Sequence, residues 1–377
     1  MLTNSNLGYI SQNYERLGKI QDQLNTGKKI SKPSDDPVVA MKGMRYRSQL
    51  IEVKQFSRNL TEGFTWLENA DAGLEETTQV LNRARDLVVQ ASNDSYNPDA
   101  RASIAKELEQ LQQHLAAMAN TKVGDNYIFN GTDTDVAPIN RNLMNLEFDN
   151  FHSELTSGTG TIDPNNYVIN YQGQTFKYST GMTFEDPQGN KITFDPATSD
   201  EVTYEYSEEL KYKDNNEAVF TKKVNATDIV ISNVNAVSTN TQDVEIEVMK
   251  GVMIPVNVRA KDAFSINMFG GLESIKKMLT NPETKGEELT KSLDSLDGFL
   301  SGVVNTRAEL GARLNRAEMV ENRLLQQQIV AEKTVSDNED IDFEKAIIDL
   351  ATQESIHKAS LAAGARIIQP TLMDFLR

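Results

Sequence analysis

Histidines are the first side chains to consider, because they could act in acid–base catalysis or bind a metal. The chain has three of them, His114, His152 and His357. None forms the helical pair of a zinc protease, in which two histidines four residues apart face one metal. We expect His114 and His357 in helices and His152 in a loop. Their separation therefore indicates no histidine metal site.

Other candidates for site chemistry are equally weak. Asp133 and Asp135 are spaced like calcium ligands, but the glycine and the closing glutamate of an EF-hand loop are missing. Adjacent acids such as Asp35 and Asp36 would need a cleft to work as an acid–base pair. The chain contains no cysteine, which excludes disulfides, thiolate nucleophiles and cysteine-based zinc sites. We therefore predict a protein that is not an enzyme, with no catalytic residue, cofactor or metal.

Long helices are the elements that most of this chain must form. Six apolar residues recur at intervals of seven: Val53, Leu60, Leu67, Leu74, Leu81 and Val88. The positions between them are mostly small, which predicts one long helix with a narrow apolar seam. A second helix is expected to begin after Asn97, with Asn97 as N-cap and Pro98 at the first helical position. Its apolar seam is formed by Ile104, Leu108, Leu111, Leu115 and Met118.

A third seam lies towards the other end of the chain. Its members are Leu289, Leu293, Leu296, Leu300, Val303, Leu310, Leu314, Ala317 and Leu324. Arg307 and Glu321 interrupt it. We expect the three seams to pack against one another.

The outermost segments carry the same pattern more weakly. The apolar positions are Leu7, Ile10, Tyr14, Leu17 and Leu24 at the start, and Phe343, Ile347, Leu350, Leu361 and Ile368 near the end. Polar or small residues also occupy this seam, among them His357 and Gly364. One short helix pair is marginal in water. We expect these helices to fray in the free monomer and to order when neighbouring copies cover them, the alternative being a stable hairpin within one subunit.

The middle of the chain changes to the period of β-strands. Hairpins are predicted for residues 167–178 around Gln172 and Gly173, for residues 182–194, and for residues 243–258. The expected fold class is mainly α with an inserted β domain: paired N- and C-terminal coiled-coil helices, an α-helical rod domain and a central antiparallel β domain. Because the insertion interrupts helices that must meet, its two connections should lie close together.

The charge and hydropathy of the chain argue against two classes of partner, nucleic acids and membranes. The formal charge is −17, and residues 151–250 hold 7 Lys or Arg against 16 Asp or Glu. This balance argues against nucleic-acid binding, which needs a basic surface. No run of eighteen apolar residues could span a membrane, and the start lacks a cleavable signal peptide. We expect neither a nucleic acid nor a membrane as partner.

A shaped joint is predicted between the first helix and the next. Gly27 can end the first helix in a left-handed conformation. Pro33 is expected to keep the link extended, and Asp36 and Pro37 to cap and begin the next helix. With Asp35, these residues form the predicted domain joint.

Residues 24–39, which contain this joint, resemble the N-terminal joint of the flagellin-like axial proteins of the bacterial flagellum. The string from Pro33 to Pro37 is similar to the version in the hook–filament junction members, whereas filament flagellins usually continue into Ala-rich sequence. Residues 44–48, 126–132, 309–314 and 361–377 also resemble that family. The similarity covers both helical thirds and leaves the β domain without a match.

The resemblance implies an extracellular axial protein of the hook–filament junction, exported through the type III apparatus without a cleaved signal peptide. Its expected partners are itself, as a ring of subunits, a hook-associated protein on the hook side and flagellin on the filament side. The family layout assigns residues 1–41 with 335–377 to an inner coiled-coil tube. It assigns residues 42–135 with 266–334 to a helical rod, and 136–265 to a solvent-facing β domain.

The resemblance also implies an assembly interface along the two terminal stripes given above. Leu372, Phe375 and Leu376 extend it as apolar anchors, and the C-terminal helix would contact an export chaperone. Three alternatives stay open: a filament flagellin, an adhesin that uses the β domain, and an enzyme carried on that same insertion.

Overall fold

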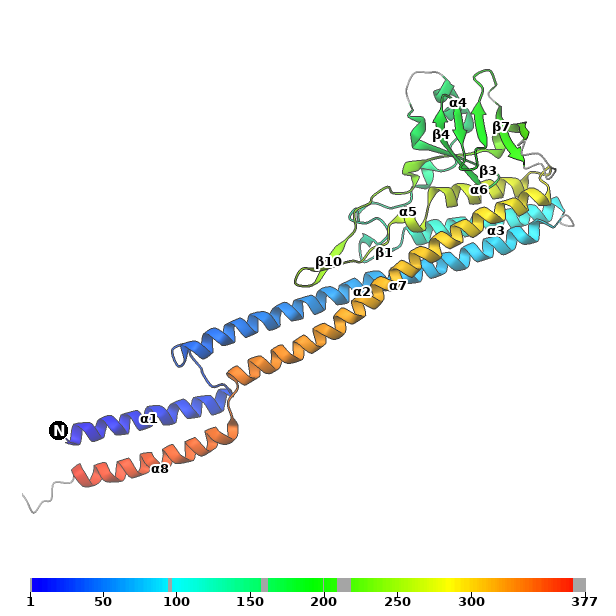
Figure 1. Cartoon of the computed structure of the whole chain (residues 1–377). Coiled ribbons are helices and arrows are strands. Elements are labelled where there is room, and N and C mark those ends of the chain that lie inside the picture. The colour runs from blue at the N-terminus through cyan, green and yellow to red at the C-terminus, as the bar shows by residue number, and fades with distance from the viewer. Residues whose placement is uncertain (1, 94–96, 157–161, 199, 209–217, 369–377) are drawn as a thin grey trace, which may run out of the picture. The chain divides into compact units, whose positions relative to one another are not determined.

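The computed structural model describes residues 2–93, 97–156, 162–198, 200–208 and 218–368 (Figure 1). The chain divides into two compact units, one formed by residues 1–58 with 320–377 and the other by residues 59–319. The mainly helical fold with an inserted antiparallel β domain agrees with the expectation from the sequence.

The smaller unit consists of helices from both ends of the chain. Helix α1 (Leu2–Thr26) packs against α8 (Phe343–Ile368). The unit also contains the beginning of α2 (Pro37–Ala91) and the end of α7 (Gly286–Glu339). Few large apolar residues are buried among its described residues; the main ones are Val53 and Leu324.

Long helices also form the base of the larger unit. The six heptad residues of α2 are all buried, which confirms the predicted seam. Arg307, which interrupts the α7 seam, pairs with Asp71 of α2 at 2.8 Å and Glu75 at 3.2 Å. Helix α3 (Pro98–Ala119) begins as predicted, because the Asn97 side chain accepts a hydrogen bond from the Ala100 amide at 2.8 Å. The interrupting arginine therefore fastens α7 to α2.

A seven-stranded antiparallel sheet lies on α6 (Ile266–Thr280), and α6 in turn packs on α3 (Figure 1). The strand order is β8-β7-β6-β5-β4-β3-β9. The strands are β3 (Tyr167–Tyr171), β4 (Gln174–Thr180), β5 (Thr183–Glu185), β6 (Lys191–Phe194), β7 (Glu201–Glu208), β8 (Ala218–Asn225) and β9 (Val230–Asn233). The first two predicted hairpins are β3–β4 and β5–β6; β8 was not predicted.

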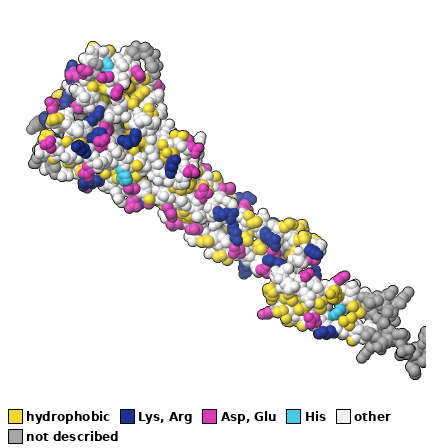
Figure 2. Space-filling view, turned by 180° about the vertical axis from the view of Figure 1, so that it is seen from behind, with side chains coloured by type: hydrophobic (Ala, Val, Ile, Leu, Met, Phe, Trp, Pro, Cys, Tyr) yellow, Lys and Arg dark blue, Asp and Glu magenta, His cyan; other side chains and the backbone are white. Residues whose placement is uncertain are grey.

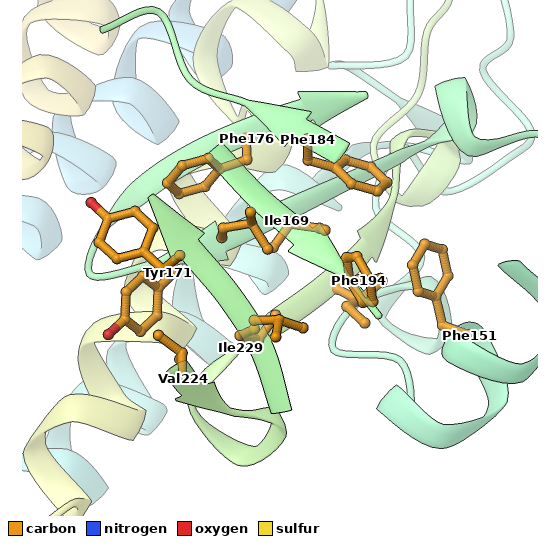
Figure 3. Close-up of a cluster of buried hydrophobic side chains, with 12 residues drawn as sticks. Phe151, Ile169, Tyr171, Phe176, Phe184, Phe194, Val224 and Ile229 are labelled. Atoms are coloured by element: carbon orange, nitrogen blue, oxygen red, sulfur yellow. The ribbon is translucent and has the colours of Figure 1, made fainter. Parts of the chain in front are cut away.

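Aromatic and branched side chains fill the curved face of this sheet. Phe176, Phe184 and Ile192 are fully buried, and Phe151 joins them from the short helix α4 (Phe148–Thr156) (Figure 3). The prediction that His152 lies in a loop is wrong, because α4 contains it. Its buried ring bonds the Asp195 carbonyl at 2.9 Å, and Phe148 stacks on it. A packing role therefore explains this histidine.

Small elements line the connections of the insertion. They are β1 (Lys122–Val123), β2 (Asn126–Tyr127), β10 (Glu245–Met249), β11 (Val252–Pro255) and α5 (Ala260–Ala263). The hairpin β10–β11 is the third one predicted. The amide of Asn140 donates to the Ala236 carbonyl and that of Ser238 to the Pro138 carbonyl, both at 2.8 Å. The segment that enters the insertion therefore lies beside residues 236–238.

Candidate assembly surface and helix joint

The terminal helices α1 and α8 meet through small and polar side chains. Asn13 donates to the Ser360 hydroxyl at 3.1 Å, and the rings of Tyr14 and His357 lie 6.0 Å apart. A Cβ at Gly364 would come within 3.3 Å of the Ile10 side chain, so glycine permits this close approach. Small and polar side chains thus take part in the contact between the two helices.

The residues predicted for the assembly interface fall into two groups in the smaller unit. Ile10, Leu17, Leu24 and Leu350 are half-buried. Tyr14, Phe343, Ile347 and Leu361 are exposed, with 47% to 68% of each residue accessible to solvent. Leu7 and Ile368 lie within α1 and α8, and Leu372, Phe375 and Leu376 lie outside the described residues.

Further exposed apolar residues in the same unit escaped the sequence analysis. Most of the large hydrophobic side chains exposed in the described residues belong to the smaller unit. Besides the four just named, they are Tyr9, Val38, Met41, Met44, Ile51, Leu325, Ile329, Val330, Ile348 and Ile356. Figure 2 shows apolar side chains gathered on the terminal helix pair. The sequence does hold a sign of these residues: they are apolar but lie outside the seam positions. A helix face that meets only water would carry polar residues there.

We use the term assembly surface for the exposed apolar residues of the smaller unit. Exposed apolar patches of this kind mark sites of protein interaction. No cluster of metal ligands is found among the residues that the structure describes. In the same part of the chain, no helix is long and apolar enough to cross a membrane.

The joint begins where Gly27 ends α1. Its φ of +68° is the left-handed conformation predicted for it, and its amide bonds the Gln23 carbonyl at 2.8 Å. The Gly27 carbonyl accepts from Ile341, and the Lys29 amide donates to Glu339 at 2.7 Å. Two main-chain bonds therefore tie the link after α1 to the link before α8.

A tight turn, rather than an extended link, follows. The Asp35 amide donates to the Lys32 carbonyl, which places Pro33 inside the turn. The Asp35 carboxylate accepts from the amides of Lys32 and Ser31, and these bonds lower the pKa of Asp35. The expectation for Pro33 was wrong because this folded-back carboxylate closes the segment. Asp36 caps α2 as predicted, and α2 begins at Pro37.

An ion cluster fastens the joint to the neighbouring helices. Arg47 forms a two-bond pair with the nearly buried Glu339 carboxylate, at 2.6 and 2.5 Å. A Cβ at Gly43 would lie 2.7 Å from Glu339 Oε1, so the glycine leaves room for the carboxylate. Lys28 bonds Asp340 at 2.6 Å, which lowers the pKa of Asp340 and raises that of Lys28. The sequence did not reveal this cluster, because its paired members lie 292 and 312 residues apart.

The two ends of the chain match known flagellar proteins. The family of the bacterial flagellin N-terminal helical region matches residues 1–134, and that of the C-terminal helical region matches residues 293–376. Together they cover more than half of the chain.

Individual relatives agree with these matches. Flagellar hook-associated protein 3 of Escherichia coli K12 is 24% identical over 96% of this chain and 94% of its own length. The protein of the same name from Salmonella typhimurium is 26% identical over 50% of this chain, and the match spans 59% of that protein. A flagellin of Clostridium tyrobutyricum is 25% identical over 86% of each chain.

The fold also has a counterpart among solved structures. A protein described as a flagellar hook-associated protein from Vibrio parahaemolyticus superposes with a TM-score of 0.54 and 17% identity, over 81% of this chain and all of that one. The matches at both helical ends, the relatives that extend over nearly the whole chain, and this shared fold agree with one another. The chain belongs to the flagellin-like family and is a structural protein of the bacterial flagellum.

Proposed function

We propose that this protein joins hook to filament and assembles as a ring of its own copies through the assembly surface. The single observation that carries this proposal is the concentration of exposed apolar side chains in the smaller unit. The match over 96% of the chain to a flagellar hook-associated protein 3 favours the junction, as does the string from Pro33 to Pro37.

Assembly would bury the apolar side chains that the monomer exposes on the assembly surface. Covering one large apolar side chain contributes about 1.5–3 kcal/mol. The terminal helices, residues 1–41 with 335–377, would form an inner tube, and residues 42–135 with 266–334 a rod around it. The β domain, residues 136–265, would face solvent. A hook-associated protein would then meet one end of the ring and flagellin the other.

The location follows from the same proposal. The protein would lie outside the cell, after export through the flagellar type III apparatus. A chaperone would cover the C-terminal helix during export, because that helix contributes exposed Phe343, Ile347 and Ile348 to the assembly surface.

Deletion of the gene in its source bacterium tests the junction role. We expect hooks without filaments by electron microscopy and flagellin released into the medium. Purified protein added back should restore filament growth. Intact filaments on the deletion strain would reject the role, and long filaments formed by this protein alone would favour the flagellin alternative.

A pair of matched variants tests the assembly surface itself. Ile347 in α8 and Val219 in β8 are both exposed, at 57% and 69%. Ile347→Asp should yield a folded monomer that cannot restore filaments, because an aspartate cannot be buried between copies. Val219→Asp should restore them normally. Equal activity of both variants, or normal incorporation of Leu17→Asp and Leu350→Asp, would contradict the tube assignment.

A further inference from the structure

A polar pocket lies in the larger unit, between the curved face of the sheet and the first turns of α7. Its volume is about 310 Å³, and it is lined by side chains from the β3–β4 turn, from β7 and β8, and from residues 285–291. Ligand pockets of proteins begin at about 300 Å³ and place a few polar groups around an apolar surface. The size therefore suits one or two sugar rings.

Aromatic rings form one wall of this pocket. Tyr204 and Tyr206 stack with ring centres 5.2 Å apart and planes inclined by 16°, and Phe220 continues the stack at 5.6 Å. The strand register explains this, because Tyr206 lies opposite Phe220 and Tyr204 opposite Lys222. Alternate residues of β7 and their partners on β8 share one face. Burial raises the pKa of Tyr204 to about 12, so its hydroxyl stays protonated and can donate.

Amide side chains stand beside the aromatic wall at the β3–β4 turn. Gln172 and Gly173 have φ values of +50° and +76°, a conformation for which asparagine, aspartate and glycine are the favoured residues. A Cβ at Gly173 would lie 3.0 Å from the Ser292 side chain, so the turn sits tightly against α7. The protein thus keeps an unfavourable glutamine where its side chain lines the pocket. Such backbone strain is typical of binding sites.

The pocket is lined by charged side chains of both signs, and the positive ones are in excess, which favours binding of an anion. Three lysines line it, Lys222, Lys285 and Lys291, against Glu287 and Glu288. Lys222 approaches Glu288 at 4.0 Å. Within the described residues, neither Lys285 nor Lys291 has a carboxylate within 4.0 Å. In a chain of net charge −17, two lysines left without an acidic partner are suited to a carboxylate of a ligand.

We propose that this pocket binds a saccharide that carries a carboxylate. The amide side chains and the tyrosine hydroxyls that line the pocket can bond the hydroxyls of a sugar. The lysines would hold the acidic group. This inference does not depend on the proposed junction role, and it gives the larger unit a binding activity of its own.

Titration calorimetry of the full chain tests the proposal with two matched ligands. Trigalacturonic acid carries a carboxylate on each ring, and α-1,4-galactotriose is its uncharged counterpart. We expect the acid to bind and the neutral sugar to bind about tenfold more weakly, because charge-assisted hydrogen bonds are lost. Absence of heat with the acid at about 10 mM would overturn the proposal. Equal affinity for the two sugars would overturn the role given to the carboxylate.

Neighbouring lysines provide the control variants. Lys222 faces the pocket, whereas Lys223 lies opposite Thr203 on the other face and pairs with Glu201 at 3.0 Å. Lys222→Gln and Lys291→Gln should each weaken binding of the acid several-fold and leave the neutral sugar unchanged, and Lys223→Gln should alter neither. Gln174→Ala should weaken both sugars. An equal loss in Lys223→Gln would show binding by general charge and contradict the site.

Discussion

The two units of this protein treat apolar side chains in opposite ways. In the larger unit, Phe176 and Phe184 are fully buried between strands and helices of the same chain. In the smaller unit, Ile347 and Ile348 remain 57% and 65% exposed. The larger unit thus satisfies its own hydrophobic pattern, whereas the smaller one presents a pattern that neighbours can cover. Stability measurements on the two units should therefore respond differently to similar substitutions.

The largest difference is expected for truncation of an apolar side chain. Phe176→Ala should lower the free energy of unfolding of the larger unit by about 3–5 kcal/mol, because it leaves a cavity in the core. Ile347→Ala should change the stability of the monomer little. Hydrogen exchange during urea titration can follow β3–β6 and α8 separately. A loss of similar size at both positions would show that the monomer buries Ile347.

The ion cluster around Glu339 provides the second test. Its central carboxylate is buried, although many of the large apolar side chains of the smaller unit are exposed. Glu339→Gln should destabilise the joint by about 2 kcal/mol, since it removes charge-assisted bonds from Arg47. The expected result is faster amide exchange at residues 27–47 and 339–343. Glu332→Gln is the control, because its pair with Lys54 is exposed and should contribute far less.

Two glycines of the smaller unit sharpen the comparison further. Gly27→Ala should cost about 1–2 kcal/mol, because the left-handed conformation is unfavourable for alanine. Gly18→Ala should instead stabilise α1 by up to about 1 kcal/mol, since open space surrounds that position within the helix. Thermal unfolding followed by helical circular dichroism measures both. The same sign for both variants would argue against the strained joint.

The smallest effect concerns acid stability of the larger unit. Hydrogen bonds from Arg259 hold the pKa of Asp243 below its usual 3.8. The pair therefore contributes stability above pH 3.8, and this is lost as pH falls through the lowered pKa. Fluorescence of Trp66, the sole tryptophan, should report a loss of about 1 kcal/mol at most. Asp243→Asn should weaken the dependence of the unfolding free energy on pH. If that dependence does not change, the pair of Asp243 with Arg259 is not its cause.

Local patterns in the sequence were sufficient for most of the architecture. The heptad spacing from Val53 to Val88 specifies one buried face of a helix, and the Asn97 cap specifies where a helix begins. Strand β8 was missed because Lys222 and Lys223 interrupt its alternation. The turn at Pro33 was missed although it is local: the Asp35 bonds that close it reach back only three and four residues, to Lys32 and Ser31.

The candidate sites also differ in how far the sequence predicts them. The two terminal stripes could be read from apolar spacing, since helical period depends only on neighbours in the sequence. The partnership of Arg47 with Glu339 could not, because 292 residues separate them. The saccharide pocket was equally hidden, as it combines a hairpin turn, two strands and the start of a helix.

By itself, the sequence determined the helices, the hairpins, the joint glycine and the resemblance to flagellar axial proteins, because all of these rest on short-range chemistry. Tertiary structure alone decided which apolar residues stay exposed, which ions meet and where a pocket opens. Those properties depend on the packing of segments distant in the chain, and burial is defined only once that packing exists.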